Sequence, residues 1–259
     1  MPLPGIPSAV LQAGFILLAL LLGVWWVFAT GKAYVVPDSG VRWNMPKATI
    51  ALGVILLWFG LLVGVSQQAW AHEFTSFPPP GLRVFLALMV VTAVIAFSPI
   101  GRKLAEGLPL IWLVGFQAFR LPTELLIYQA AEAGVAPMEQ TFHGRNFDII
   151  TAILALVLMV LLRRGEVSSK LILGWNILGL ALLLNVVVTA IMAMPHPMQV
   201  LHTNPPNVWV TYFPFILLPG VAVCSALLGH LLVFRALTAY HLTQRAKTVA
   251  RRYVEKSIH

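Results

Sequence analysis

Long apolar runs, separated only by short segments, dominate the chain. Each run is close to 20 residues long, which is enough for a helix to cross a hydrocarbon core of about 30 Å. We find no internal repeat and no segment that could fold as a separate soluble domain. The pattern predicts an all-α polytopic membrane protein, a single bundle of seven transmembrane helices. The predicted spans cover residues 8–30, 48–70, 82–98, 108–131, 147–163, 170–194 and 208–234.

Composition supports the same class. Of the 259 residues, 59% are hydrophobic and only 10% are charged, whereas a soluble domain carries about 25% charged residues. The first ten residues, MPLPGIPSAV, contain no basic group, and no small-residue cleavage pattern follows the first apolar run. We therefore expect a retained first helix and not a removed signal peptide. Residues 1–239 are predicted to form the bundle, and residues 240–259 a basic cytoplasmic tail.

The basic residues predict the orientation. Lys and Arg next to membrane spans stay on the cytoplasmic side, and an odd number of spans places the two termini on opposite sides. With the N-terminus outside and the C-terminus in the cytoplasm, 14 of the 17 basic residues are cytoplasmic, and only Arg83 and Arg145 lie outside. The net charge of +8 then reflects topology and not nucleic-acid binding, and membrane lipids are the expected surroundings. The cytoplasmic set is Lys32, Arg42, Lys47, Arg102, Lys103, Arg163, Arg164, Lys170, Arg235, Arg245, Lys247, Arg251, Arg252 and Lys256.

The fourth predicted span contains charged residues near its centre. In FRLPTE, Arg120 and Glu124 stand four residues apart, on one face of a helix, where they can pair. An ionised side chain at that depth costs about 2.5–3.5 kcal/mol, so this face is predicted to point into the bundle. Pro122 loosens the same turn because it has no amide hydrogen. Gln117 and Tyr128 extend the polar stripe along the helix.

Other polar residues belong to the same outer half of the predicted bundle. Asn146 and Asp148 stand where the fifth span begins, Asn185 lies in the sixth, and Tyr212 enters the seventh. We hypothesise an outward-opening polar cavity with Arg120 and Glu124 at its floor. The alternative is a structural ion pair that fixes helix packing without a ligand.

Histidines on the outer side raise the question of a metal. His143, His196 and His202, together with Glu139, are imidazole and carboxylate groups that suit Zn, Cu or Fe. Their spacing matches no metal motif, and helix capping or headgroup contact explains them equally well. They are weak candidates, and the sequence identifies no cofactor.

Three strings carry a resemblance to a known family. FRLPTELLIY (119–128), TFHGRNFDI (141–149) and NPPNVWVTYFPFILLPG (204–220) resemble a family of bacterial seven-span inner-membrane proteins to which no activity is assigned. The likeness covers about residues 110–240. It implies the bacterial inner membrane as the location, and it favours the group formed by Arg120, Glu124, Asn146 and Asp148 over His143 as the site.

Three functions remain open from the sequence. The first is binding or transport of a small molecule or ion in the outward-facing cavity. The second is a metal-dependent intramembrane hydrolase, although His230 lacks the HxxxH partner that seven-span zinc hydrolases carry on their last span. The third is a structural or assembly protein whose stiff outer loops and basic tail bind other proteins. Whether the chain is an enzyme is left open by the sequence.

Overall fold

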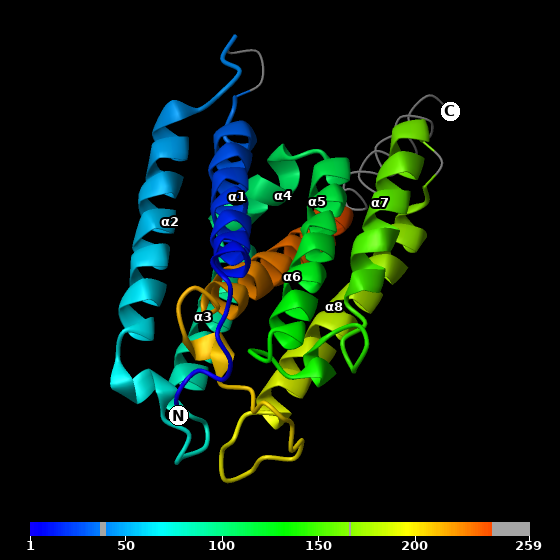
Figure 1. Cartoon of the computed structure of the whole chain (residues 1–259). Coiled ribbons are helices and arrows are strands. Elements are labelled where there is room, and N and C mark those ends of the chain that lie inside the picture. The colour runs from blue at the N-terminus through cyan, green and yellow to red at the C-terminus, as the bar shows by residue number, and fades with distance from the viewer. Residues whose placement is uncertain (37–39, 166, 240–259) are drawn as a thin grey trace, which may run out of the picture.

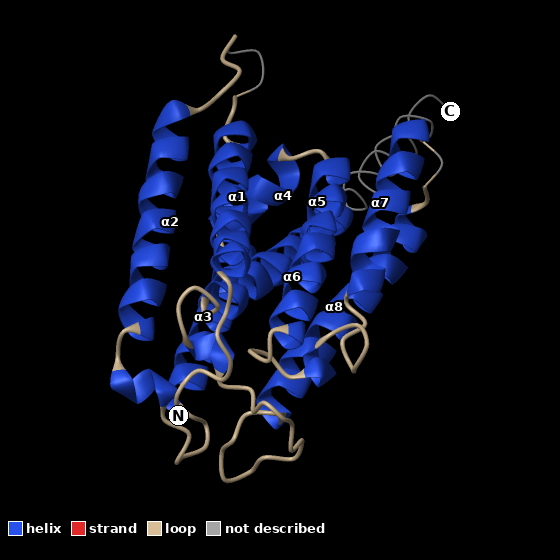
Figure 2. Ribbon diagram, viewed as in Figure 1, coloured by secondary structure: helices blue, strands red, loops and turns tan. Residues whose placement is uncertain are grey.

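The computed structural model describes residues 1–36, 40–165 and 167–239, and all regular secondary structure in these ranges is helical (Figure 2). The predicted basic tail, residues 240–259, lies outside the described residues. The all-α, multi-pass class is confirmed, because six helical segments are long and apolar enough to cross a membrane. They are α1 (Ala9–Ala33), α2 (Met45–Ser66), α3 (Pro80–Phe97), the segment Leu110–Glu132, α8 (Ser169–Met192) and the last helix, Leu218–Ala239.

The fifth predicted span is shorter than these six. It corresponds to α7 (Ile149–Arg164), whose 16 residues reach about 24 Å along the axis. Figure 1 shows α7 running beside α8 towards the end of the bundle opposite the N-terminus. The helix ends at Arg164, and the next residue, Gly165, adopts a left-handed conformation with φ of 74°, as is common after a helix. That α7 crosses the membrane stays a prediction.

The last predicted span begins later than the sequence indicated. Residues 208–217 form irregular structure and the short 3-10 turn Trp209–Thr211, and the membrane-length helix starts only at Leu218. Pro214 accounts for the delay, because it has no amide hydrogen and disfavours helical backbone at the residue before it. The first turns, Leu218–Val223, are π-helical.

The segment Leu110–Glu132 is also interrupted, in a way that positions the site. It consists of α5 (Leu110–Phe116), a 3-10 turn (Gln117–Phe119) and α6 (Arg120–Glu132). Pro122 therefore lies in the first turn of α6, where a missing amide hydrogen costs little because those amides have no partner within the helix. Arg120 consequently starts a new helix at mid-span.

The bundle has an exposed edge and a buried centre. In Figure 1, α1 and α2 stand side by side, α5, α6, α7 and α8 form the other flank, and the last helix, in orange, crosses behind α5 and α6. The most apolar window of α2 is only 17% buried, whereas that of the last helix is 61% buried. A short amphipathic helix, α4 (Pro99–Gly107), follows α3 directly. The last helix is thus the core element against which the site is built.

Candidate intramembrane binding site

An ion pair joins the start of α6 to the start of α7. Arg120 Nε lies 2.7 Å from Asp148 Oδ2, and both residues are buried. The sequence predicted Glu124 as the partner, and this part of the prediction is wrong: Arg120–Asp148 is the ion pair that the structure forms among the described residues. An i, i+4 spacing allows two side chains to meet, but Glu124 is engaged by Asn146 instead, whose Nδ2 donates to Glu124 Oε2 at 2.7 Å.

The guanidinium also reaches the last helix. Arg120 Nη1 lies 3.0 Å from His230 Nε2 and 3.5 Å from the carbonyl oxygen of Gly179. On the far side of the ring, His230 Nδ1 lies 2.8 Å from Asn176 Oδ1. The amide of Asn176 is oriented by its Nδ2, which donates to the His230 carbonyl. Asn176 Oδ1 can only accept a hydrogen bond, and the Arg120 N–H can only donate one. His230 therefore carries its proton on Nδ1 and accepts from Arg120 through Nε2.

Apart from Trp25 Nε1, which lies away from this group, and Arg120 Nε, which faces Asp148, two buried side-chain nitrogens have no acceptor within the described protein. One is Nη2 of Arg120, a residue only 2% exposed. The other is Nε2 of Gln140, whose Oε1 accepts from Trp209 Nε1 at 3.1 Å and so fixes the orientation of the amide. A buried donor without an acceptor costs about 1–3 kcal/mol. The protein therefore maintains hydrogen-bonding capacity that its own atoms do not use.

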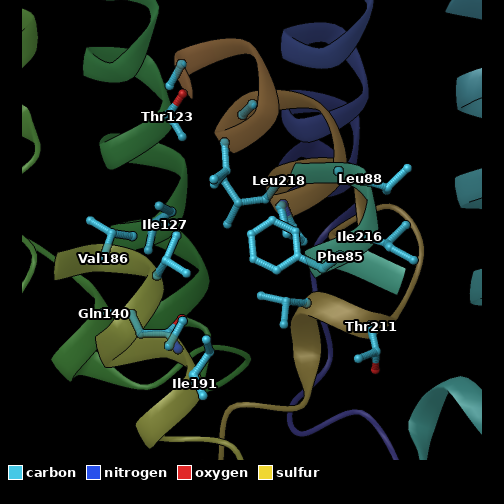
Figure 3. Close-up of a pocket in the computed structure, with 18 of the residues that line it drawn as sticks. Phe85, Leu88, Thr123, Ile127, Gln140, Val186, Ile191, Thr211, Ile216 and Leu218 are labelled. Carbon is cyan, nitrogen blue, oxygen red and sulfur yellow. The ribbon is translucent and has the colours of Figure 1, made fainter. Parts of the chain in front are cut away.

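A cavity of about 100 Å³ brings these groups together. Its polar end is formed by Arg120, Glu124, Gln140, Asn146 and Asp148, and the rest of its wall is largely apolar. Figure 3 shows Ile127, Val186, Gln140 and Ile191 on one side of the space and Phe85, Ile216 and Leu218 on the other. The arrangement suits a guest with a polar head and an apolar body.

A compact loop holds the polar end in place. Asn146 Nδ2 donates to the Gln140 carbonyl at 3.0 Å as well as to Glu124, and its Oδ1 accepts from the backbone amide of Asp148 at 2.9 Å. The loop thereby fixes Asp148 immediately before α7. Asn146 thus connects the loop with α6.

Four of the eight predicted ligand-binding residues line the cavity: Arg120, Glu124, Asn146 and Asp148. The other four do not line it. Gln117 is fully buried and donates to the Ala226 carbonyl, and Tyr128 packs against Phe142 and His143. Asn185 donates to the Arg145 carbonyl, and Tyr212 stacks on His72.

The metal candidates make other contacts. His143 packs against the ring of Tyr128. His196 is bonded through Nε2 to the Ile191 carbonyl and through Nδ1 to the Met198 amide. His202 is exposed and Glu139 partly exposed. Within the described ranges, no three His, Cys, Asp or Glu side chains converge as a metal site would require.

His72 joins two segments beside the cavity that are far apart in the sequence. Its Nδ1 lies 2.9 Å from Oγ1 of Thr211, a lining residue, and its Nε2 lies 3.1 Å from the Ser66 carbonyl oxygen. Partial burial lowers the pKa of the imidazole, the hydrogen bond to Ser66 opposes this, and the Met1 amino group adds to the lowering. The neutral form is therefore favoured in the folded protein.

Sequence reasoning missed three residues of the site. Gln140 supplies one of the two free donors, and His230 and Asn176 extend the Arg120 network into the core. Asn176 and His230 are polar groups inside apolar spans, which is the signal that singled out Arg120. Gln140 lies in a loop and gave no such signal.

Comparison with known proteins places the chain in a family. A family model described as a domain of unknown function (DUF8737) matches residues 79–238, well over half of the chain. The chain belongs to this family. The DUF8737 match begins just before α3 and ends near the end of the last helix, so it contains every polar group of the cavity. No curated protein and no solved structure gives a significant match.

Proposed function

We propose that this protein binds a small molecule or ion within the bacterial inner membrane, in the cavity at Arg120, as a step in its transport or sensing. In this proposal α7 is a seventh span, the N-terminus lies outside, and the polar end of the cavity faces the outer side. Gln140 and Asn146, which belong to a loop on the same side as the N-terminus, support that direction.

The observation that carries the proposal is that two residues lining the cavity, Arg120 and Gln140, each have a buried donor without a protein acceptor, Nη2 and Nε2 respectively. A purely structural ion pair is most stable when all of its hydrogen-bonding groups are satisfied. Here Nη2 of the Arg120 guanidinium and Nε2 of the Gln140 amide have no acceptor within the described protein. The oxygen atoms of a guest would complete both sets of bonds, which is how polar groups in binding pockets orient a ligand.

The test is binding of sodium butyrate to the purified full-length protein, followed by thermal unfolding. Butyrate offers a carboxylate to the free donors and a short apolar body to the wall. We expect it to raise the midpoint of unfolding in a concentration-dependent way. Gln140→Glu should abolish this rise, because the new oxygen still accepts from Trp209 but replaces the free donor by an acceptor.

The matched control is Gln67→Glu, the same substitution at an exposed residue outside the cavity lining. It should keep the wild-type response. If butyrate does not stabilise the wild type, or if it stabilises Gln140→Glu as much as the wild type, the cavity does not bind ligands in the way proposed. If Gln140→Glu and Gln67→Glu lose the stabilisation by butyrate equally, the proposal is also contradicted, because the added negative charge alone would then explain the loss.

A further inference from the structure

The cavity lies between two membrane-spanning helices that do not pack closely along each other. α3 contributes Val84 and Phe85 to its wall, and α8 contributes Val186, Ala190 and Ile191. Among the described elements, α3 packs mainly against α4, the turn Ala69–His72 and the start of the last helix, whereas α8 packs mainly against α7 and the turn Met138–Gln140. All five wall residues are partly exposed. Between α3 and α8 the cavity is thus closed off by these apolar side chains and not by a close contact between the two helices.

The volume constrains what can enter. Pockets for drug-sized molecules hold about 300–1,000 Å³, whereas this cavity holds about 100 Å³. A polar head group and the first part of a hydrocarbon chain fit, and the rest of a longer molecule has to extend outside the cavity. The apolar side between α3 and α8, in the membrane-spanning part of the chain, is the route along which a hydrocarbon tail avoids contact with water.

We propose that the ligand is a single-chain amphiphile with a carboxyl head, of the fatty-acid type, which enters sideways from the bilayer between α3 and α8. This inference rests on the proposed function and deepens it. The carboxyl oxygens bond to Arg120 Nη2 and Gln140 Nε2. The acyl chain lies along Phe85 and Val186 and extends into the lipid.

The charges of the site restrict the form in which such a ligand binds. The titratable side chains among the described lining residues are Arg120, Glu124 and Asp148, and His230 contacts Arg120 from the other side. α3, α8 and the last helix bring no charged group to the wall. Two carboxyl groups already face one guanidinium, so a bound carboxylate adds a negative charge that is balanced only if a proton is taken up with it. The ligand and one proton therefore bind together.

The experiment compares butyrate with decanoate on the full-length protein in nanodiscs, with binding measured by thermal unfolding and by native mass spectrometry. Decanoate should bind at least about tenfold more tightly than butyrate. Val186→Trp, which fills the gap between α3 and α8, should weaken decanoate binding by a similar factor and butyrate binding by clearly less. Val188→Trp is the control, because Val188 lies on the same helix, is exposed and does not line the cavity.

Each outcome separates this inference from the proposed function. If butyrate binds as tightly as decanoate, the site stands and the amphiphile is overturned. If Val186→Trp leaves decanoate binding intact, or if Val188→Trp weakens it equally, sideways entry is overturned. If neither compound binds the wild type, the proposed function itself fails.

Discussion

Asp148 compensates a guanidinium that would otherwise stand unpaired inside the bundle. Removing one partner of a buried ion pair costs about 3–5 kcal/mol, because the other charge stays buried without compensation. Asp148→Asn should therefore destabilise the protein by roughly this amount in unfolding titrations. The double variant Arg120→Gln, Asp148→Asn removes both charges and should be more stable than Asp148→Asn alone. If the double variant is less stable than either single one, the two residues act independently.

We expect Glu124 to take up the proton that accompanies a bound carboxylate. Its side chain accepts from Asn146, and Gln can keep this bond through its own amide oxygen. In the wild type, decanoate should bind more tightly at about pH 6 than at about pH 8, because proton uptake becomes harder as the pH rises. Glu124→Gln removes one negative charge from the site, so its affinity should vary less between these pH values. A pH dependence unchanged by the substitution would exclude Glu124 as the proton acceptor.

At the scale of elements, glycine lets α8 approach the last helix. A Cβ atom on Gly179 would lie 2.5 Å from His230 Cε1 and 2.7 Å from Thr151 Cγ2. His230 cannot easily move aside, because Arg120 and Asn176 hold both of its ring nitrogens. Gly179→Ala should destabilise the protein by about 1–3 kcal/mol, the usual cost of overpacking.

The same helix offers the control for that substitution. A Cβ atom on Gly174 would meet no atom within 4 Å, so Gly174→Ala should be neutral or stabilising by up to about 1 kcal/mol through helix propensity. Thermal unfolding of both variants measures the difference. If Gly174→Ala proves as destabilising as Gly179→Ala, close packing at His230 is not the reason.

The contact between the turn Ala69–His72 and the segment after Trp209 predicts a pH effect on stability. Because the pKa of His72 is lower in the folded protein than its ordinary value of about 6.5, the unfolded chain takes up its proton first as the pH falls. Stability should be full above about pH 6.5 and decrease below it. His72→Gln should flatten this part of the curve of unfolding midpoint against pH. If the curve keeps its slope, the effect arises from another group.

At the scale of the whole molecule, the topology can be tested with the lone cysteine, Cys224, removed. In the Cys224→Ala background, Ser76→Cys lies in a predicted outer segment and Lys103→Cys in a predicted cytoplasmic one. A membrane-impermeant maleimide added to intact cells should label only Ser76→Cys, and after lysis it should label both. The reverse pattern would show the opposite orientation. Labelling of both variants in intact cells would contradict the prediction that α3 crosses the membrane between the two positions.

The sequence by itself determined the class of this protein. Run length and composition are local properties, and the thickness of the bilayer fixes how many apolar residues a crossing helix needs, so six of the predicted spans appear as helices of membrane length. The same reasoning identified Arg120 as a buried functional candidate, because a charge in an apolar run is costly wherever the run folds. Local pattern also indicated Asn146 and Asp148, which line the cavity with it.

The tertiary structure decided which groups meet. Spacing along one helix left Glu124 as the natural partner of Arg120, but the rotation of α6 and the approach of α7 brought Asp148 closer. Likewise, only the packing of the last helix against α6 and α8 placed His230 between the guanidinium and Asn176, and only the fold of a loop brought Gln140 to the cavity. These choices depend on helix rotation and crossing geometry, which residues far apart in the chain determine jointly and which periodicity within one segment does not contain.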